Sequence, residues 1–284
     1  MKVLICGASG LLGSSMSEVF LTDDLVVEKH GNTFSEYVDI SADLTILKEA
    51  ERIILDSNPD VIINLCCLSD VDKCERDHNL AFKLNVLITR NLCEIITKHQ
   101  LSAKFIQIST DQLYNGIGPQ AETEVKILNY YSETKYQSEK IATEIGGCVL
   151  RTNFFGKSKA EHKVSFSDWV LTSINDDSTK YFSDVHFNPL SMKSLSSILS
   201  KIIRKKIFSG VFNLGSRGGM SKYIFASHLA SKIGIELDKD RAISIDEISM
   251  SAFRPKGMIM DCTKFESTYG IILPTLIEEI DKYA

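Results

Sequence analysis

Short apolar runs and longer amphipathic stretches alternate along the first half of the chain. Several of the runs are almost continuously apolar, as strands buried on both faces of a parallel sheet are. The longer stretches repeat their apolar residues at helical spacing. This pattern predicts strands at residues 2–6, 25–28, 36–38, 61–65, 105–109 and 148–151, and helices at 11–20, 46–55, 81–99 and 131–145.

Alternation of strands and helices from the first residues onward predicts an α/β protein with a Rossmann-type, doubly wound parallel sheet. Beyond about residue 152 the pattern weakens, although 164–175, 195–203 and 221–233 still have helical periodicity. The run at 210–214 is predicted to rejoin the first sheet. We therefore expect a first domain over residues 1–152 and a smaller C-terminal α/β lobe over 153–284.

The composition is that of an ordinary globular protein, since 44% of the 284 residues are hydrophobic and 24% are charged. This balance excludes a disordered chain. A formal net charge of −5, without a basic stripe, gives no sign of a nucleic-acid partner. The chain has no apolar stretch of about 18 residues, so no membrane-spanning helix is predicted. The N-terminal MKVLICGASG does not resemble a signal peptide, so a cytoplasmic protein is expected.

The cysteines stand at positions 6, 66, 67, 74, 93, 148 and 262, and no two form a CxxC pair. An odd number without such pairs fits thiols in a reducing compartment. Neither the cysteines nor the six histidines cluster at the spacing of metal ligands, so no metal site is predicted.

A glycine loop follows the first predicted strand directly and precedes the first predicted helix. Its spacing is GxxGxxG, with Gly7, Gly10 and Gly13. Gly7 permits the tight turn, Gly10 lets the backbone approach a pyrophosphate, and Gly13 allows helix and strand to pack closely. The helix N-terminus offers free N–H groups to phosphates. The loop therefore predicts dinucleotide binding by the first domain.

The sequence does not single out one residue as the contact to the adenosine ribose. Glu28, at the predicted end of the second strand, could accept the ribose hydroxyls of NAD, whereas Lys29 and His30 could attract a 2′-phosphate. We favour NADPH slightly, with NADH as the alternative. The carboxylate of Asp39, followed by Ile40, could meet the adenine amino group.

Tyr131 and Lys135 form a YxxxK pair, which places both on one face of a helix. The ammonium is expected to lower the pKa of the phenol, so that Tyr131 can give a proton to a carbonyl oxygen as hydride reaches the carbon. The same lysine can hold the nicotinamide ribose. Thr110, at the end of the strand 105–109, could bind the substrate oxygen and complete the set.

With these elements the chain resembles the extended short-chain dehydrogenase/reductases, and within them the dTDP-4-dehydrorhamnose reductase group. Arg254, in a late Arg-Pro pair, and Asn85 belong to this resemblance. The matching blocks span nearly the whole chain and read GASGLLG, PDVIINLCCLSDVDKCE, AFKLNV, STDQLYNG, NYYSETKYQSEK and LRTNFFG.

The resemblance implies an NAD(P)H-dependent reductase of a nucleotide-linked 4-keto-6-deoxysugar in deoxysugar biosynthesis, and a possible homodimer. It makes Thr110, Tyr131 and Lys135 the catalytic residues, Asn85 a structural one, and Arg254 a contact to the sugar nucleotide. The substrate would also meet Asp111 and Asn153. The cofactor would contact Gly7, Ser9, Gly10, Leu11, Leu12, Gly13, Lys29, Asp39, Ile40, Leu65, Cys66, Cys67, Tyr131 and Lys135.

Two departures from the group's pattern concern the substrate. Gln112 stands where the group has an aromatic residue, and Asn153-Phe154-Phe155 replaces a segment with a tryptophan. The only tryptophan, Trp169, is predicted to pack within the second lobe. Two alternatives stay open: an epimerase or dehydratase of the same family, and a non-catalytic regulatory subunit that binds a dinucleotide. A dehydratase usually has a second acid where Gln112 stands, and a pure binding subunit has no need of the Thr110–Tyr131–Lys135 set.

Overall fold

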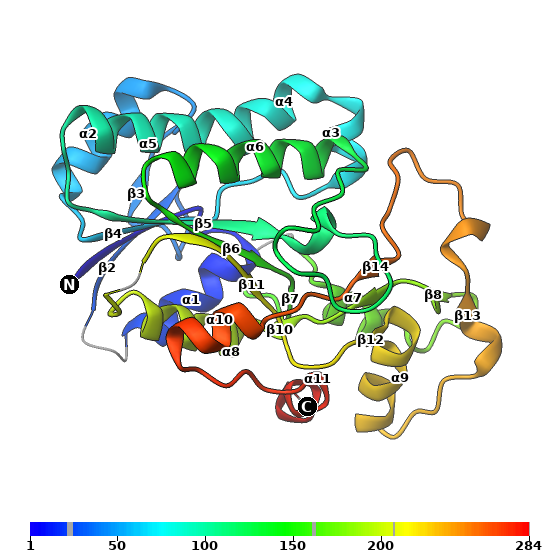
Figure 1. Ribbon diagram of the computed structural model, residues 1–284. Coiled ribbons are helices and arrows are strands. Elements are labelled where there is room, and N and C mark those ends of the chain that lie inside the picture. Colours follow the sequence, from blue (N-terminus) through cyan, green and yellow to red (C-terminus); the bar gives the residue numbers. More distant parts are fainter. Residues whose placement is uncertain (22–24, 161–162, 207, 284) are drawn as a thin grey trace.

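The computed structural model describes residues 1–21, 25–160, 163–206 and 208–283. A seven-stranded sheet lies at its centre, in the order β11-β6-β5-β4-β1-β2-β3 with every neighbouring pair parallel (Figure 1). This confirms the predicted α/β class and the return of 210–214 to the sheet. The strands are β1 (Lys2–Cys6), β2 (Val26–Gly31), β3 (Ile40–Ser41), β4 (Val61–Asn64), β5 (Lys104–Thr110), β6 (Cys148–Thr152) and β11 (Gly210–Leu214).

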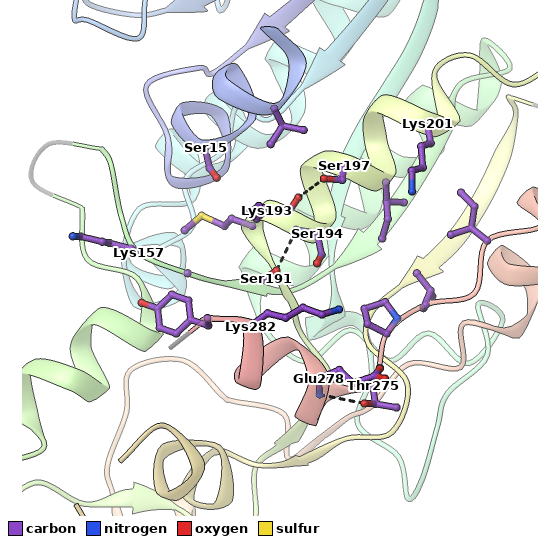
Figure 2. Close-up of a pocket in the computed structure, with 18 of the residues that line it drawn as sticks. Ser15, Lys157, Ser191, Lys193, Ser194, Ser197, Lys201, Thr275, Glu278 and Lys282 are labelled. Atoms are coloured by element: carbon purple, nitrogen blue, oxygen red, sulfur yellow. Dashed lines mark hydrogen bonds between the residues drawn. The ribbon is translucent and has the colours of Figure 1, made fainter. Parts of the chain in front are cut away.

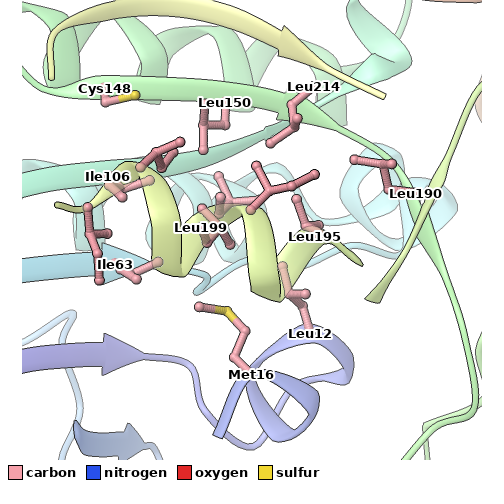
Figure 3. Packing of buried hydrophobic residues seen from close by; sticks show 14 of the residues in the cluster. Leu12, Met16, Ile63, Ile106, Cys148, Leu150, Leu190, Leu195, Leu199 and Leu214 are labelled. Atoms are coloured by element: carbon pink, nitrogen blue, oxygen red, sulfur yellow. The ribbon is translucent and has the colours of Figure 1, made fainter. Parts of the chain in front are cut away.

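Helices cover both faces of this sheet (Figure 1). Helices α1, α8 and α10 pack on one face, and α2, α5 and α6 on the other. In Figure 3, side chains of α1 and α8 interlock with those of the strands. Helix α8, from the second half of the chain, thus completes the core of the first. The bounds are α1 (Leu11–Leu21), α2 (Leu47–Ser57), α5 (Ile88–Lys98), α6 (Tyr130–Glu144), α8 (Met192–Ile202) and α10 (Thr263–Tyr269).

The helix predicted at 81–99 is divided. Short α4 (His78–Phe82) follows α3 (Val71–Arg76), and a π-helical turn over Lys83–Leu87 joins α4 to α5. Such π-turns occur mostly singly within α-helices and often near functional sites. The turn carries Asn85, whose amide bonds lie close to the site described below.

The second strand runs further than predicted, and the third begins later. Strand β2 extends to Gly31 because Cys6 of β1 pairs with His30 and the amides of Gly7 and Ala8 both donate to the His30 carbonyl. The predicted strand at 36–38 is wrong: the amide of Val38 donates to the Ser35 carbonyl in a turn. Glu28 therefore lies within a strand rather than at its end.

Two-residue strands pair distant parts of the chain in the second lobe, around a separate apolar core. Trp169 stacks on Phe166 and meets the edge of Tyr181, as its predicted packing role requires. No helix of the described residues is long and apolar enough to cross a membrane. The elements are β7 (Phe154–Phe155), α7 (Phe166–Ser173), β8 (Tyr181–Phe182), β9 (His186–Phe187), β10 (Leu190–Ser191), β12 (Met220–Ser221), α9 (Lys222–Lys232), β13 (Ala242–Ile243), β14 (Gly257–Met258) and α11 (Leu276–Tyr283).

Candidate active site

A cavity of about 240 Å³ lies at the carboxyl ends of the central strands, beside the reversal of strand order. We call it the strand-end cavity. The predicted residues in its wall are Gly7, Gly10, Leu11, Leu12, Gly13, Leu65, Cys67, Thr110, Asp111, Tyr131, Lys135 and Asn153. The residues that sequence reasoning did not assign are Ser69, Ile108, Ser109, Gln112, Thr152, Phe154 and Lys163.

The glycine loop forms one wall, and two of its glycines are required by geometry. Gly7 has φ +90°, which side chains rarely adopt. A Cβ on Gly13 would lie 2.6 Å from the Ala8 Cα, so α1 can approach the loop only with glycine there. Helix α1 begins at Leu11, and the amides of its first turn have no partner within the helix. These amides form an anion site of the kind that holds a pyrophosphate.

Thr110 and Tyr131 meet in the cavity. Thr110 ends β5, Tyr131 lies in the first turn of α6, and both line the cavity, with the Thr110 side chain close enough to influence the phenol. Lys135 follows one helical turn later, and its ammonium donates to the Ile108 carbonyl at 2.6 Å. Asn129 caps this helix, accepting from the Ser132 amide at 2.7 Å. The cap fixes where α6 starts, and with it the position of Tyr131.

The pKa of Tyr131 does not follow the sequence-based expectation. Burial raises it well above the ordinary value of 10, and the negative form of Cys67 would raise it further, whereas the Thr110 hydroxyl lowers it. The prediction of a lowered pKa is wrong for this structure, because burial of the phenol outweighs the groups that act in the opposite direction. The phenol therefore carries its proton at neutral pH, as a proton donor must.

The segment after β4 forms the wall opposite the glycine loop. The Asn85 side chain accepts from the Leu68 amide at 2.6 Å and donates to the Thr134 hydroxyl at 2.9 Å. It thus ties this segment to α6 and fulfils the structural role predicted for it. Cys67 faces the cavity, whereas the Cys66 thiol lies against Gly7. Burial raises the pKa of Cys66 to about 12.

The predicted contacts to the adenosine lie outside the strand-end cavity. Lys29 and Asp39 form an ion pair at 3.2 Å, and the Asp39 carboxylate also accepts from the Lys29 amide. Ile40 continues from Asp39 into β3. Ser9 belongs to the glycine loop but does not line the cavity. The charge of Lys29 is therefore already shared with a carboxylate of its own chain.

Two of the residues considered for the ribose are engaged elsewhere. Glu28 forms an ion pair with Lys2 at 2.8 Å, on the neighbouring strand. The His30 ring is buried, and its Nε2 lies 3.0 Å from the Ala42 carbonyl. Burial lowers the pKa of His30, so the ring is neutral at pH 7 and does not face a 2′-phosphate. The suggestion that His30 meets such a phosphate is therefore wrong.

Asp111 lies between Thr110 and the segment that follows β6. It is 2% exposed, accepts from the Asn153 amide at 2.6 Å, and lies 3.4 Å from the Thr110 hydroxyl. Burial raises the pKa of Asp111 to about 6, although Asn153 and Lys222 act in the opposite direction. Asp111 is therefore a titratable group beside the reacting hydroxyls.

Two cations approach this region from the second lobe. Lys222 begins α9, lies over the Phe166 ring at 5.3 Å, and is electrostatically coupled to Asp111 and Arg254. Burial lowers the pKa of Lys222. Arg254 forms an ion pair with Asp72 of α3 at 2.7 Å and lies outside the wall of the strand-end cavity. Together they place positive charge on the lobe's side of the site.

A buried polar network holds the ends of β5 and β6. Arg151 forms an ion pair with Glu139 of α6 at 2.7 Å, and both side chains are almost fully buried. Glu139 also accepts from the Ser109 hydroxyl at 2.5 Å, and Arg151 donates to the Tyr114 hydroxyl at 2.7 Å. The network joins α6 to both strands directly behind Thr110 and Tyr131.

Sequence reasoning missed Lys163, Lys222 and Glu139. Lys163 reaches the cavity from the segment before α7, and its Nζ lies 3.9 Å from the position of a Cβ on Gly10. Nothing in the local pattern marks Lys163, because it approaches the glycine loop from a distant segment. Lys222 did have a signal, since it follows the N-cap Ser221 directly. Glu139 lies one turn beyond Lys135, which places it on the same face of α6.

Comparison with known proteins agrees with this geometry. The family model of the RmlD substrate binding domain matches residues 1–284. A dTDP-4-dehydrorhamnose reductase of Aggregatibacter actinomycetemcomitans is 27% identical, over 95% of this chain and 94% of its own. The methionine adenosyltransferase 2 subunit beta of Xenopus laevis is 25% identical, over 93% of this chain and 81% of its own. A crystal structure of dTDP-4-dehydrorhamnose reductase from Bacillus anthracis, in complex with NADP, superimposes with a TM-score of 0.87 at 20% identity, covering 99% of this chain and 96% of its own.

Proposed function

The chain belongs to the family of the RmlD substrate binding domain, and from this premise we propose that it is an NAD(P)H-dependent reductase. Its substrate is a nucleotide-linked 4-keto-6-deoxysugar, as the name of the Aggregatibacter relative suggests. The observation that supports the proposal is that Thr110, Tyr131 and Lys135 line the same cavity as the glycine loop. Proton donor and phosphate site thus share one space.

The residues present fit a dinucleotide. The first-turn amides of α1 and the ammonium of Lys163 converge on Gly10, where a pyrophosphate's charge needs donors. Leu65 and Cys67 offer an apolar wall, and Lys135 lies where it can donate to a ribose hydroxyl. We favour NADPH, with NADH as the alternative. When bound, the nicotinamide supplies the hydride.

Tyr131 donates its phenolic proton to the keto oxygen as the carbon receives the hydride, and the product is an alcohol. The high pKa keeps that proton on Tyr131 until the oxygen becomes basic. Thr110 orients the phenol and hydrogen-bonds the same oxygen. Asp111 and Asn153 position the sugar, and Phe154 covers it from the lobe. Lys222 and Arg254 attract the diphosphate of the nucleotide.

Two other functions receive less support. A dehydratase usually has two acids after the threonine; here Asp111 is the first, and Gln112 stands where the second is typical. A regulatory subunit is a real alternative, because the Xenopus relative is named as a subunit. A pure binding protein, however, has no use for a buried Thr110–Tyr131 pair beside Lys135. We also propose a cytoplasmic location and a homodimer, the latter testable by sedimentation equilibrium.

The deciding experiment follows the absorbance of NADPH, and of NADH in parallel, with purified protein and dTDP-4-dehydro-6-deoxysugar. We expect oxidation that depends on the sugar nucleotide, with a higher kcat/KM for NADPH. Bound cofactor without turnover on any keto sugar would instead support the regulatory subunit. Tightly retained NAD after purification would support an epimerase.

A further inference from the structure

A second hollow lies away from the strand-end cavity and shares none of its lining residues. It has a volume of about 1060 Å³ and lies between α1, α8, α11 and the segments after β7 and α10 (Figure 2). We call it the basic groove. Its charged residues are Lys157, Lys159, Lys193, Lys201, Arg217 and Lys282, against Glu18 and Glu278.

Most of this positive charge is not neutralised by the protein. Glu18 is paired with Lys159. The Glu278 carboxylate accepts from the Thr275 amide, the Glu278 amide donates to the Thr275 hydroxyl, and the carboxylate's charge is shared with Lys282 and Arg217. Within the described part of the chain, no carboxylate lies within 4 Å of the ammonium groups of Lys157, Lys193, Lys201 or Lys282. A cleft lined by one sign of charge concentrates counter-ions, and here it does so on a chain of net charge −5.

The wall of the groove is rigid where α8 meets α11. The buried Glu279 accepts from the Ser191 amide at 2.7 Å and from the Ser194 hydroxyl at 2.7 Å. These bonds engage the first turn of α8 and hold it against α11. The helices that carry Lys193 and Lys282 are thereby held against each other, and both lysines line the groove (Figure 2).

The groove also has an apolar surface. Val19, Ile271 and Pro274 are half-buried in its wall, and Ile198 and Leu273 lie beneath. A bare inorganic ion would leave this surface uncovered. A ligand with a charged end and a flat apolar end would use both, and the volume suits a molecule of nucleotide size.

We propose that the basic groove binds an organic phosphate of nucleotide size, with its phosphates among Lys193, Lys201 and Lys282 and its apolar part against Ile271 and Pro274. This site is separate from the cofactor and substrate site and does not depend on the reductase activity. The two sites draw on neighbouring residues of the chain, since Phe154 and Lys163 line the strand-end cavity and Lys157 and Lys159 line the groove.

Isothermal titration calorimetry with ADP and with inorganic pyrophosphate tests the proposal. ADP could also occupy the glycine loop, so each titration is repeated with NADPH at saturation. We expect ADP binding to persist in NADPH, to be tighter than pyrophosphate binding, and to weaken with added salt. The Lys193→Gln/Lys282→Gln variant should bind ADP about tenfold more weakly or worse, because two charge contacts are lost.

The matched control is Lys48→Gln/Lys83→Gln, which removes the same charge from exposed positions on the opposite face of the sheet (Figure 1). It should bind ADP as the unmodified protein does. Equal ADP affinity in both double variants would overturn the proposal, as would the absence of binding in NADPH. So would a homodimer that the Lys193→Gln/Lys282→Gln change alone dissociates, because the groove would then be a subunit interface. Reductase activity has no part in these readouts.

Discussion

The two sides of the strand-end cavity are built differently. On the sheet side, Gly7 to Gly13, Thr110, Tyr131 and Lys135 lie at the ends of sheet strands or in the first two turns of the helices that pack on the sheet. On the lobe side, Lys163 and Arg254 come from segments outside helices and strands, and Lys222 begins α9. The groups proposed for proton transfer, which need close positioning, therefore lie on the sheet side. The lobe side carries charge, which acts over longer distances and tolerates variation.

This difference also explains where the chain departs from its relatives' expected pattern. The glycine loop and the Tyr-Lys pair are intact, whereas Gln112 and Phe154 are altered positions, and both line the strand-end cavity. A family can change its substrate by changing residues that line such a cavity while the reaction stays the same. The variants below are chosen to separate the two sides.

The largest effect is expected from Tyr131→Phe, on the sheet side. Removal of the proton donor should lower kcat about 10²–10⁴-fold, since general acid catalysis contributes that much. Cofactor affinity, measured by titration of NADPH fluorescence, should hardly change. Tyr136→Phe is the matched control, because Tyr136 lies on the same helix over Lys140 and outside the cavity. A Tyr131→Phe enzyme of nearly normal rate would disprove the proton-donor role.

Glu139→Gln should be the most destabilising change behind the sheet side. It leaves the buried Arg151 guanidinium without its carboxylate, which typically costs about 3–5 kcal/mol. Urea unfolding followed by circular dichroism measures the loss. On the lobe side, Asp246→Asn removes an exposed partner of Lys256 and should cost far less. Similar losses in both variants would mean that the two sides are not held differently.

Asp111→Asn should change how stability depends on pH. The folded pKa is raised to about 6 from the ordinary 3.8, so the folded state binds more protons than the unfolded state between these values. Asp111 therefore lowers the free energy of unfolding as pH rises from about 4 to 6, by up to about 3 kcal/mol. The variant should gain stability relative to the unmodified protein over that range and hold the gain above pH 6. A pH-independent difference in unfolding free energy would contradict the assignment.

Lys222→Met tests the lobe side. Loss of one cation near the diphosphate should raise KM for the sugar nucleotide about tenfold, with a smaller effect on kcat. Lys222→Arg keeps the charge and should recover most of the affinity. A fall in kcat at unchanged KM would instead place Lys222 in the chemical step, through Asp111. Initial rates at varied substrate concentration distinguish these outcomes.

The smallest effect is expected from Lys29→Gln. Its ammonium is already paired with Asp39, so the kcat/KM ratio of NADPH to NADH should fall by no more than about fivefold. Asp39→Asn frees the lysine and should shift the ratio toward NADPH. If Lys29→Gln abolishes the NADPH preference, the lysine turns from Asp39 to the 2′-phosphate when the cofactor binds.

Local patterns in the sequence were sufficient for the parallel sheet, the glycine loop and the Thr110–Tyr131–Lys135 set. A strand buried on both faces needs a continuous apolar run, and a helix brings residues four apart onto one face. These relations hold within a short segment, so the spacing of the residues expresses them directly. The return of residues 210–214 to the sheet was predictable for the same reason.

Only the tertiary structure determined which charged residues are paired and which titratable groups are buried. It buried His30, which removed one suggested phosphate contact, and it paired Lys29 with Asp39. It raised the pKa of Tyr131 through burial, where spacing alone predicted a fall. It brought Lys163 to Gly10 from a distant segment. Burial and pairing depend on residues that are far apart along the chain, so no local pattern can express them.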